Sequence, residues 1–178
     1  IQAEISGIPG RFIFDTGANL ALLQSLTSRL KIIDSENIPV QDANGVISSY
    51  KKLTIDQIGL GSMHFKNAEA VELTDFDHLK CFGVSGLIGA NLFENHVVRI
   101  DYKNKMISIS SGIEKFDLNG ASSLPMSVKA GNCPFFRVSL GKSTDEVLFD
   151  TGDGGFYSLN NENFNRLQPL GVLDIKSR

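Results

Sequence analysis

Phe14-Asp15-Thr16-Gly17 follows the apolar pair Phe12-Ile13, and the same four residues recur as Phe149-Asp150-Thr151-Gly152 after Val147-Leu148. Each copy places an aspartate on a tight turn at the end of a strand-like apolar run, and the glycine relaxes the backbone of that turn. An acidic side chain is costly beside a buried strand unless its carboxylate has a chemical task. The repeat therefore predicts two carboxylates that meet across a pseudo-two-fold axis.

The composition is that of an ordinary globular protein, and it argues against several classes of partner. The chain has 178 residues, of which 42% are hydrophobic and 21% are charged, and its net charge is −3. This charge gives no electrostatic reason to expect nucleic acid as a partner. The sequence has no apolar run of about 18 residues, so we expect no membrane span.

The cysteines and the first residue bear on the compartment. Two cysteines, Cys81 and Cys133, fit either two buried free thiols or one disulfide, so the redox environment stays open. The chain begins at Ile1 without an initiator methionine, which suggests a trimmed product. A trimmed start favours a secreted or periplasmic location.

Short runs of β-branched and aromatic residues predict an all-β fold with one or two short helices. Strands are expected over residues 5–8, 11–14, 48–58, 64–73, 97–101 and 106–110, and short helices over 25–30 and 90–95. Asn44-Gly45 is a strong hairpin turn between two strand-like stretches. Residues 102–105 are expected to form the turn of a second hairpin.

The internal repeat extends beyond the two turns and organises the chain. Residues 4–7 correspond to residues 137–140, and an Asp-Thr-Gly turn follows in both copies. The second copy has no counterpart of residues 41–110, so we expect the chain to be a fragment of a longer two-lobed protein. We expect three parts in this chain: a first lobe over residues 1–115, a linker over 116–123 and a partial second lobe over 124–178.

A motif downstream of the first turn completes a family resemblance. Leu87-Ile88-Gly89 resembles the hydrophobic-hydrophobic-glycine motif that aspartic proteases place beneath the catalytic turn. Asn44, Gly45 and Val46 would form the tip of a substrate flap. The chain resembles a retroviral-type (retropepsin-like) aspartic protease, as a two-lobed, bacterial-style member with a truncated second lobe. The resemblance implies a retropepsin-like acid-protease barrel and the first half of a second, similar lobe.

The resemblance also implies an aspartic endopeptidase that acts on a peptide or protein, with Asp15 and Asp150 as its catalytic pair. Two carboxylates about 3 Å apart cannot both ionise, so one acts as base on a water while the other acts as acid. The threonines of Thr16-Gly17 and Thr151-Gly152 would lock the two turns together, and the glycines would let backbone N–H groups approach the carboxylates. We expect neither a cofactor nor a metal.

Two positions qualify this reading. Ala18 follows the first turn, as in retroviral-type enzymes, where pepsin-like enzymes carry a hydroxyl, so we expect a less depressed carboxyl pKa and an optimum nearer neutral pH. Asp153 occupies the matching position in the second copy, and a third carboxylate there would resist ionisation unless it points into solvent or pairs with a cation. Two alternatives stay open: a homodimer that pairs Asp15 with its symmetry mate, and a catalytically inactive module that keeps the fold for binding or dimerisation.

Overall fold

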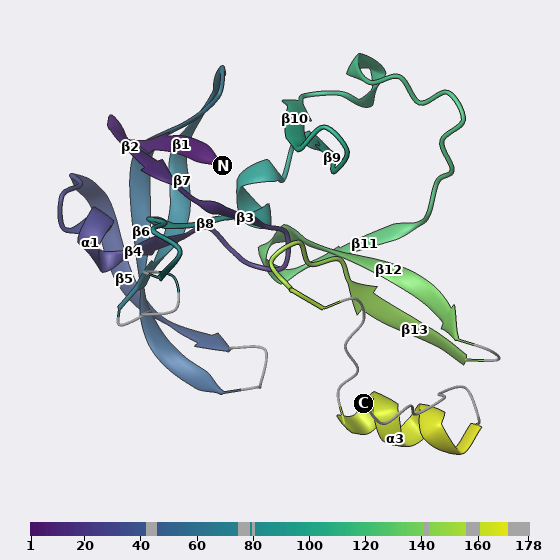
Figure 1. Ribbon diagram of the computed structural model, residues 1–178. Coiled ribbons are helices and arrows are strands. Elements are labelled where there is room, and N and C mark those ends of the chain that lie inside the picture. Colours follow the sequence, from purple (N-terminus) through teal and green to yellow (C-terminus); the bar gives the residue numbers. More distant parts are fainter. Residues whose placement is uncertain (42–45, 75–78, 80, 141–142, 156–160, 171–178) are drawn as a thin grey trace.

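The computed structural model describes residues 1–41, 46–74, 79, 81–140, 143–155 and 161–170 (Figure 1). Its strands are β1 (Gln2–Ile5), β2 (Ile8–Arg11), β3 (Ile13–Asp15), β4 (Ala21–Leu23), β5 (Ile32–Gln41), β6 (Ile47–Leu60), β7 (Met63–Leu73), β8 (Gly86–Gly89), β9 (Val97–Asp101), β10 (Met106–Ser110), β11 (Met126–Lys129), β12 (Cys133–Leu140) and β13 (Ser143–Leu148). Its helical segments are α1 (Gln24–Thr27), η1 (Ala90–Phe93), η2 (Ile113–Lys115), η3 (Ala130–Asn132), α3 (Asn161–Leu167) and η4 (Gln168–Leu170). The all-β prediction is confirmed. Among these described segments, no helix has the length and apolar character to cross a membrane.

The first half of the chain forms one nearly closed, barrel-like sheet. Eight strands lie in the order β2-β1-β6-β7-β4-β8-β3, with β5 also paired to β6. Strand β8 runs parallel to β3 on one side and antiparallel to β4 on the other. Because β8 lies between these two strands, the turn that leads from β3 towards β4 passes over the end of β8 (Figure 1).

The strand expected at residues 5–8 was wrong, and the bounds of another strand were not predicted. The strand expected over residues 5–8 is a hairpin turn, since Ser6 and Gly7 have φ angles of 46° and 84° and join β1 to β2. Positive φ at both positions matches the right-handed twist of the flanking strands. Strand β5 is the strand-like stretch expected before Asn44-Gly45, but its bounds were not predicted, because its polar stretch at residues 34–37 hides the alternation of a half-buried strand.

The barrel holds two clusters of buried apolar side chains. The smaller one consists of Ala21, Leu23, Val71, Leu73 and Leu79. The larger one fills the barrel, and its fully buried side chains are Ile5, Phe12, Leu20, Leu22, Leu53, Ile55, Ile58 and Ile88. Burial of each such side chain contributes about 1.5–3 kcal/mol relative to exposure. Phe12 belongs to the larger cluster and Phe14 packs against it, while Ile13 packs against the smaller cluster, so the first Asp-Thr-Gly turn stands on a rigid base.

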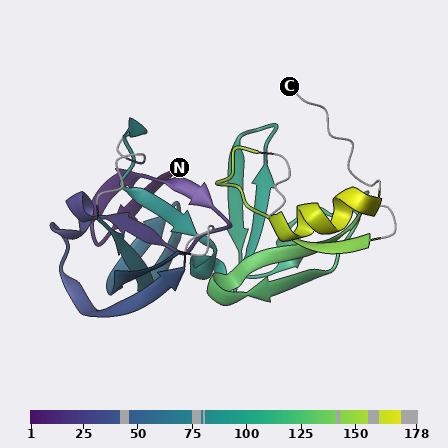
Figure 2. The same ribbon diagram turned by 90° about the horizontal axis from the view of Figure 1, so that it is seen from below.

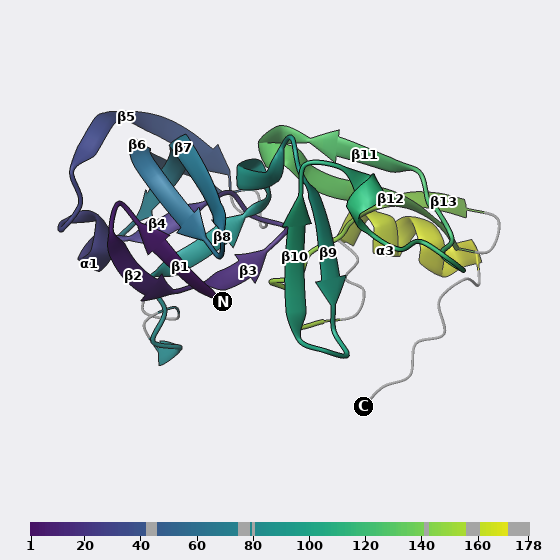
Figure 3. The same ribbon diagram turned by 90° about the horizontal axis from the view of Figure 1, so that it is seen from above.

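The second half of the chain is smaller and more open. Strands β11, β12 and β13 form an antiparallel sheet, with α3 beside it (Figure 2). Strands β9 and β10 pair as the expected hairpin and stand next to both the barrel and this sheet (Figure 3). Val98 of β9 packs against the barrel core and also lines a pocket with Met126 and Val128 of β11. The β9–β10 hairpin thus bridges the two halves, and residues 116–125 then run without helix or strand to β11.

Candidate active site

The two Asp-Thr-Gly turns meet within one chain through reciprocal hydrogen bonds. The Thr16 N–H donates to Thr151 Oγ1 at 3.1 Å, and the Thr16 hydroxyl donates to the Phe149 carbonyl at 2.6 Å. In return, the Thr151 N–H donates to Thr16 Oγ1 at 3.0 Å, and the Thr151 hydroxyl donates to the Phe14 carbonyl at 3.0 Å. Each threonine therefore binds the backbone of the opposite turn, which gives the site the pseudo-two-fold symmetry expected from the repeat.

The two carboxyl groups lie side by side between these turns. Gly17 N–H donates to Asp15 Oδ1 at 2.8 Å, and Gly152 N–H donates to Asp150 Oδ1 at 2.8 Å. A Cβ atom added to Gly17 would overlap the Asp150 carboxyl, and one added to Gly152 would overlap the Asp15 carboxyl. Each carboxyl thus touches the glycine of the opposite turn, where no larger residue fits.

The electrostatic setting favours the protonated form of Asp15. The pKa of Asp15 rises from 3.8 to about 6, first because the carboxyl is half-buried, and then because of the charge of Asp150 and a hydrogen bond with it. Backbone N–H groups of Gly17 and Ala18 lower the same pKa, but by less. The main causes of the raised pKa are burial and the second carboxyl, and the optimum expected nearer neutral pH stays a prediction. Two carboxyl groups in such contact disfavour the ionisation of both, which leaves room for one proton between them.

The Leu87-Ile88-Gly89 motif supports the first turn from below. It forms β8, which pairs with β3 so that Ile88 lies opposite Phe14 and Gly89 lies opposite Asp15. Ile88 is fully buried in the barrel core. A Cβ atom on Gly89 would overlap the backbone of residues 18–20, so only glycine lets the turn rest on the strand. The Ala90 N–H then donates to the Ala18 carbonyl at 2.8 Å.

Sequence reasoning missed a second support, the side chain of Asn91. Its Oδ1 accepts the Leu20 N–H at 2.7 Å, and its Nδ2 donates to the Glu69 carbonyl at 2.9 Å. It therefore ties the segment after the first turn to β7. A polar side chain directly after Leu87-Ile88-Gly89-Ala90 was the available signal, since a buried apolar motif is an unusual neighbour for asparagine.

Asp153 follows the second Asp-Thr-Gly turn as Ala18 follows the first, and its side chain is exposed. Its N–H donates to Asp150 Oδ1 at 3.2 Å, while its own Oδ1 accepts the Gly155 N–H at 2.8 Å. The Asp153 carboxylate is therefore held by its own loop. Asp153 is thus the third carboxylate that the sequence places close to Asp150, and its side chain is exposed to solvent.

The expected flap is described in part. Strands β5 and β6 pair antiparallel, with Gln41 opposite Ile47, and the end of this hairpin extends beyond the pairing of β6 with β7. Asn44 and Gly45 lie outside the described residues, and Val46 is exposed. The hairpin arms therefore fit a flap, and its tip stays a prediction.

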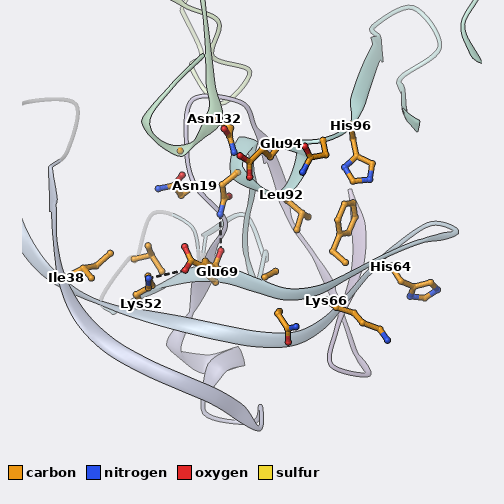
Figure 4. A pocket seen from close by; sticks show the side chains of 18 residues that line it. Asn19, Ile38, Lys52, His64, Lys66, Glu69, Leu92, Glu94, His96 and Asn132 are labelled. Carbon is orange, nitrogen blue, oxygen red and sulfur yellow. Dashed lines mark hydrogen bonds and ion pairs between the residues drawn. The ribbon is translucent and has the colours of Figure 1, made fainter. Parts of the chain in front are cut away.

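Two pockets lie near the junction of the two halves. The larger, of about 700 Å³, is polar, and Figure 4 shows Asn19 and Asn132 among the side chains that surround it. Neither aspartate lines this pocket, and its residues Lys52 and Glu69 already pair at 3.0 Å (Figure 4). The smaller pocket, of about 290 Å³, is mainly apolar and is lined by residues beside both aspartates, including Phe14, Thr16 and Phe149.

The cysteines are both free, Cys81 on the surface and Cys133 buried. The interpretation as two buried thiols is therefore right for Cys133 only. Burial raises the pKa of the Cys133 thiol, and the nearby charges of Asp15 and Asp150 raise it further. Cys133 is thus a neutral neighbour of the two carboxyls. In the described part of the chain, no group of His, Cys, Asp and Glu side chains has the arrangement of a metal site.

Comparison with known families agrees with this geometry. A family model described as aspartyl protease matches residues 1–92, which is more than half of the chain and includes the first Asp-Thr-Gly turn, the β5–β6 hairpin and the supporting motif. A search among curated proteins found no match. The chain therefore belongs to the retropepsin-like aspartyl protease family.

Proposed function

We propose that this chain is an endopeptidase in which Asp15 and Asp150 activate a water molecule against a peptide bond. The observation that supports this most directly is the reciprocal contact of each carboxyl with the glycine of the opposite turn. This contact brings two acidic groups into one partly desolvated site, where they cannot both ionise. An aspartic endopeptidase needs one acid and one base at the same place and pH, and such a pair supplies both.

The reaction follows from the single shared proton. The ionised aspartate removes a proton from the water as its oxygen bonds to the carbonyl carbon, and the protonated aspartate gives its proton to the carbonyl oxygen. The tetrahedral diol then returns one hydroxyl proton to the carboxylate. The other aspartate protonates the amide nitrogen as the C–N bond breaks. One proton remains on the pair at the end, so the site is ready for a second cycle.

The substrate we propose is an extended peptide that lies between the carboxyl pair and the β5–β6 hairpin. The hairpin arms pair over residues 32–41 and 47–55, and their outer part, residues 38–41 and 47–50, extends beyond the pairing of β6 with β7 as a two-stranded arm. An extended peptide can add main-chain hydrogen bonds to such an arm and leave its side chains to determine specificity. Asn44, Gly45 and Val46 would close over it.

The test is cleavage of a fluorogenic peptide library by the wild type and by two single variants, Asp15→Asn and Asp150→Asn. Each substitution keeps the shape of the side chain and removes the acid, so each should reduce the cleavage rate by about 10²–10⁴-fold. Asp117→Asn, in the exposed segment before β11, is the matched control and should keep full activity. Activity should also fall as the pH rises through about 6, because Asp15 then loses the shared proton.

The outcomes separate the alternatives. Loss of activity in Asp15→Asn together with full activity in Asp150→Asn would indicate a homodimer that pairs Asp15 with its symmetry mate. Full activity in both variants would exclude the paired-aspartate mechanism. If the wild type cleaves no peptide at any pH but still binds a peptide whose scissile carbonyl is replaced by a secondary alcohol, the chain is an inactive binding module.

A further inference from the structure

The base of the β5–β6 hairpin, where the outer arm meets the barrel, borders the larger pocket. Strand β6 pairs with β5 over residues 47–55 and with β7 over residues 51–60. Lys52 lies in the short stretch, residues 51–55, where β6 has β5 on one side and β7 on the other, and its side chain lines the pocket (Figure 4). A side chain at this place can contact the arm and the barrel at once.

Lys52 forms an ion pair on each side. Its Nζ lies 2.8 Å from Oε1 of Glu36 on β5 and 3.0 Å from Oε1 of Glu69 on β7. Glu36 is the cross-strand partner of Lys52, whereas Glu69 is a diagonal neighbour that lies opposite Thr54. Hydrogen bonds with Glu36 and then with Glu69 raise the pKa of the Lys52 ammonium. One cation therefore joins the arm strand to the barrel strand.

The backbone of Glu69 is tied to the segment that leaves the first Asp-Thr-Gly turn. Its carbonyl accepts a hydrogen bond from Asn91 Nδ2 at 2.9 Å, and Asn91 Oδ1 accepts the Leu20 N–H at 2.7 Å. The Leu20 carbonyl in turn accepts the Val71 N–H of β7 at 2.9 Å. The carboxylate of Glu69 thus holds the arm through the lysine, and its carbonyl holds the segment after the turn through Asn91.

These ion pairs bear on the direction of the arm more than on the stability of the barrel. The side chain of Lys52 is 29% exposed and the two glutamates are 60% and 63% exposed, and ion pairs at such sites contribute little to folding. The barrel is stabilised by its two apolar clusters. The outer arm, residues 38–41 and 47–50, extends beyond the pairing of β6 with β7, so its direction depends on the contacts at its base.

We propose that Lys52 is a positioning residue that holds the outer arm of the β5–β6 hairpin at a fixed place relative to the carboxyl pair, through Glu36 and Glu69. This inference rests on the proposed peptidase function and adds to it the group that places the substrate-binding arm. A peptide gains main-chain hydrogen bonds from the arm only where the arm lies at the right distance. Loss of the Lys52 charge therefore weakens the binding of the ground state and of the transition state equally, which raises KM and leaves kcat unchanged.

The experiment compares Lys52→Met with Lys51→Met on an uncharged fluorogenic peptide. Both substitutions remove one positive charge and keep an unbranched side chain, but Lys51 is exposed and, as the adjacent residue of the strand, points to the opposite face of the sheet. Lys52→Met should raise KM about three- to tenfold, the value expected for two exposed ion pairs, and keep kcat within about twofold of the wild type. Lys51→Met should keep the wild-type KM, and so should Lys52→Arg, which retains the charge.

A salt titration of the wild type gives an independent measurement that needs no variant to fold. Exposed ion pairs weaken with salt, because the Debye length falls from about 10 Å at 0.1 M to about 3 Å at 1 M. The KM of the wild type should therefore rise over this range towards that of Lys52→Met. The KM of Lys52→Met should not change with salt.

The outcomes are separable from those of the proposed function. An unchanged KM in Lys52→Met, an equal rise in Lys51→Met, or a wild-type KM that does not respond to salt overturns the role of Lys52. Cleavage that Asp15→Asn abolishes leaves the peptidase intact in each of these cases. If no peptide is cleaved, the same comparisons are made with Kd for an uncharged peptide that has a secondary alcohol in place of the scissile carbonyl. Equal Kd values for the wild type and Lys52→Met also overturn the inference.

Discussion

The contact between the two turns makes a prediction that separates an intrachain pair from every other arrangement. Thr151→Val keeps the shape of the side chain and removes one hydroxyl. That hydroxyl accepts the Thr16 N–H at 3.1 Å and donates to the Phe14 carbonyl at 3.0 Å. Both backbone groups lose their partner in a partly buried place, so we expect a loss of about 1–3 kcal/mol in the free energy of unfolding.

The reciprocal variant, Thr16→Val, removes the acceptor of the Thr151 N–H and the donor to the Phe149 carbonyl. Since the two hydroxyls belong to one network, the double variant should cost less than the sum of the single variants, with a coupling of about 0.5–3 kcal/mol. Urea denaturation followed by circular dichroism measures all three. Thr144→Val, at an exposed position of β13, is the control and should stay within about 0.5 kcal/mol of the wild type.

Two results would refute this reasoning. Strictly additive losses would mean that the threonines act separately and that the turns are not held by this network. A Thr151→Val variant as stable as the wild type, with a Thr16→Val variant whose stability depends on protein concentration, would mean that the first turn pairs with its symmetry mate in a dimer.

Three further predictions concern the carboxyl pair and its support. Gly17→Ala should abolish peptide cleavage because the new methyl group overlaps the Asp150 carboxyl, whereas Gly154→Ala, which meets open space, should keep it. The pKa of Asp15 is raised from 3.8 to about 6, so between these pH values the folded state holds a proton that the unfolded chain releases. Thermal stability should therefore fall over this range as pH rises, by about 1–2 kcal/mol after solvent screening, and Asp15→Asn should remove this dependence. Ile88→Ala should destabilise the fold by about 2–5 kcal/mol in urea denaturation, because it opens a cavity beneath the turn.

The fold was predictable where local pattern and turn chemistry agree. Strands β9 and β10 begin and end where the sequence predicts, because their alternating residues are joined by a polar four-residue turn. The bounds of strand β5 could not be predicted, since it is held by pairing with β6 and by little apolar burial of its own. The division into lobes and the secreted or periplasmic location stay predictions.

The candidate site was predictable in its parts and not in its assembly. The repeat identified Asp15 and Asp150, but sequence similarity between two turns does not say whether they meet in one chain or across two. That depends on the tertiary contacts of Thr16 and Thr151. The support by Asn91 was missed for the same reason, because its partners at Leu20 and Glu69 are distant in sequence.

The chemistry of the pair depends on the docking of the two halves. Burial and the charge of Asp150 are the two largest causes that raise the pKa of Asp15, and both require the turns to be in contact. A variant with weakened contact, such as Thr151→Val, should therefore show a pKa of Asp15 closer to 3.8 whenever the turns separate. In the pH profile of peptide cleavage, its activity should then decline at a lower pH than that of the wild type. If the activity of the variant declines at the same pH as that of the wild type, the first turn alone determines the pKa of Asp15.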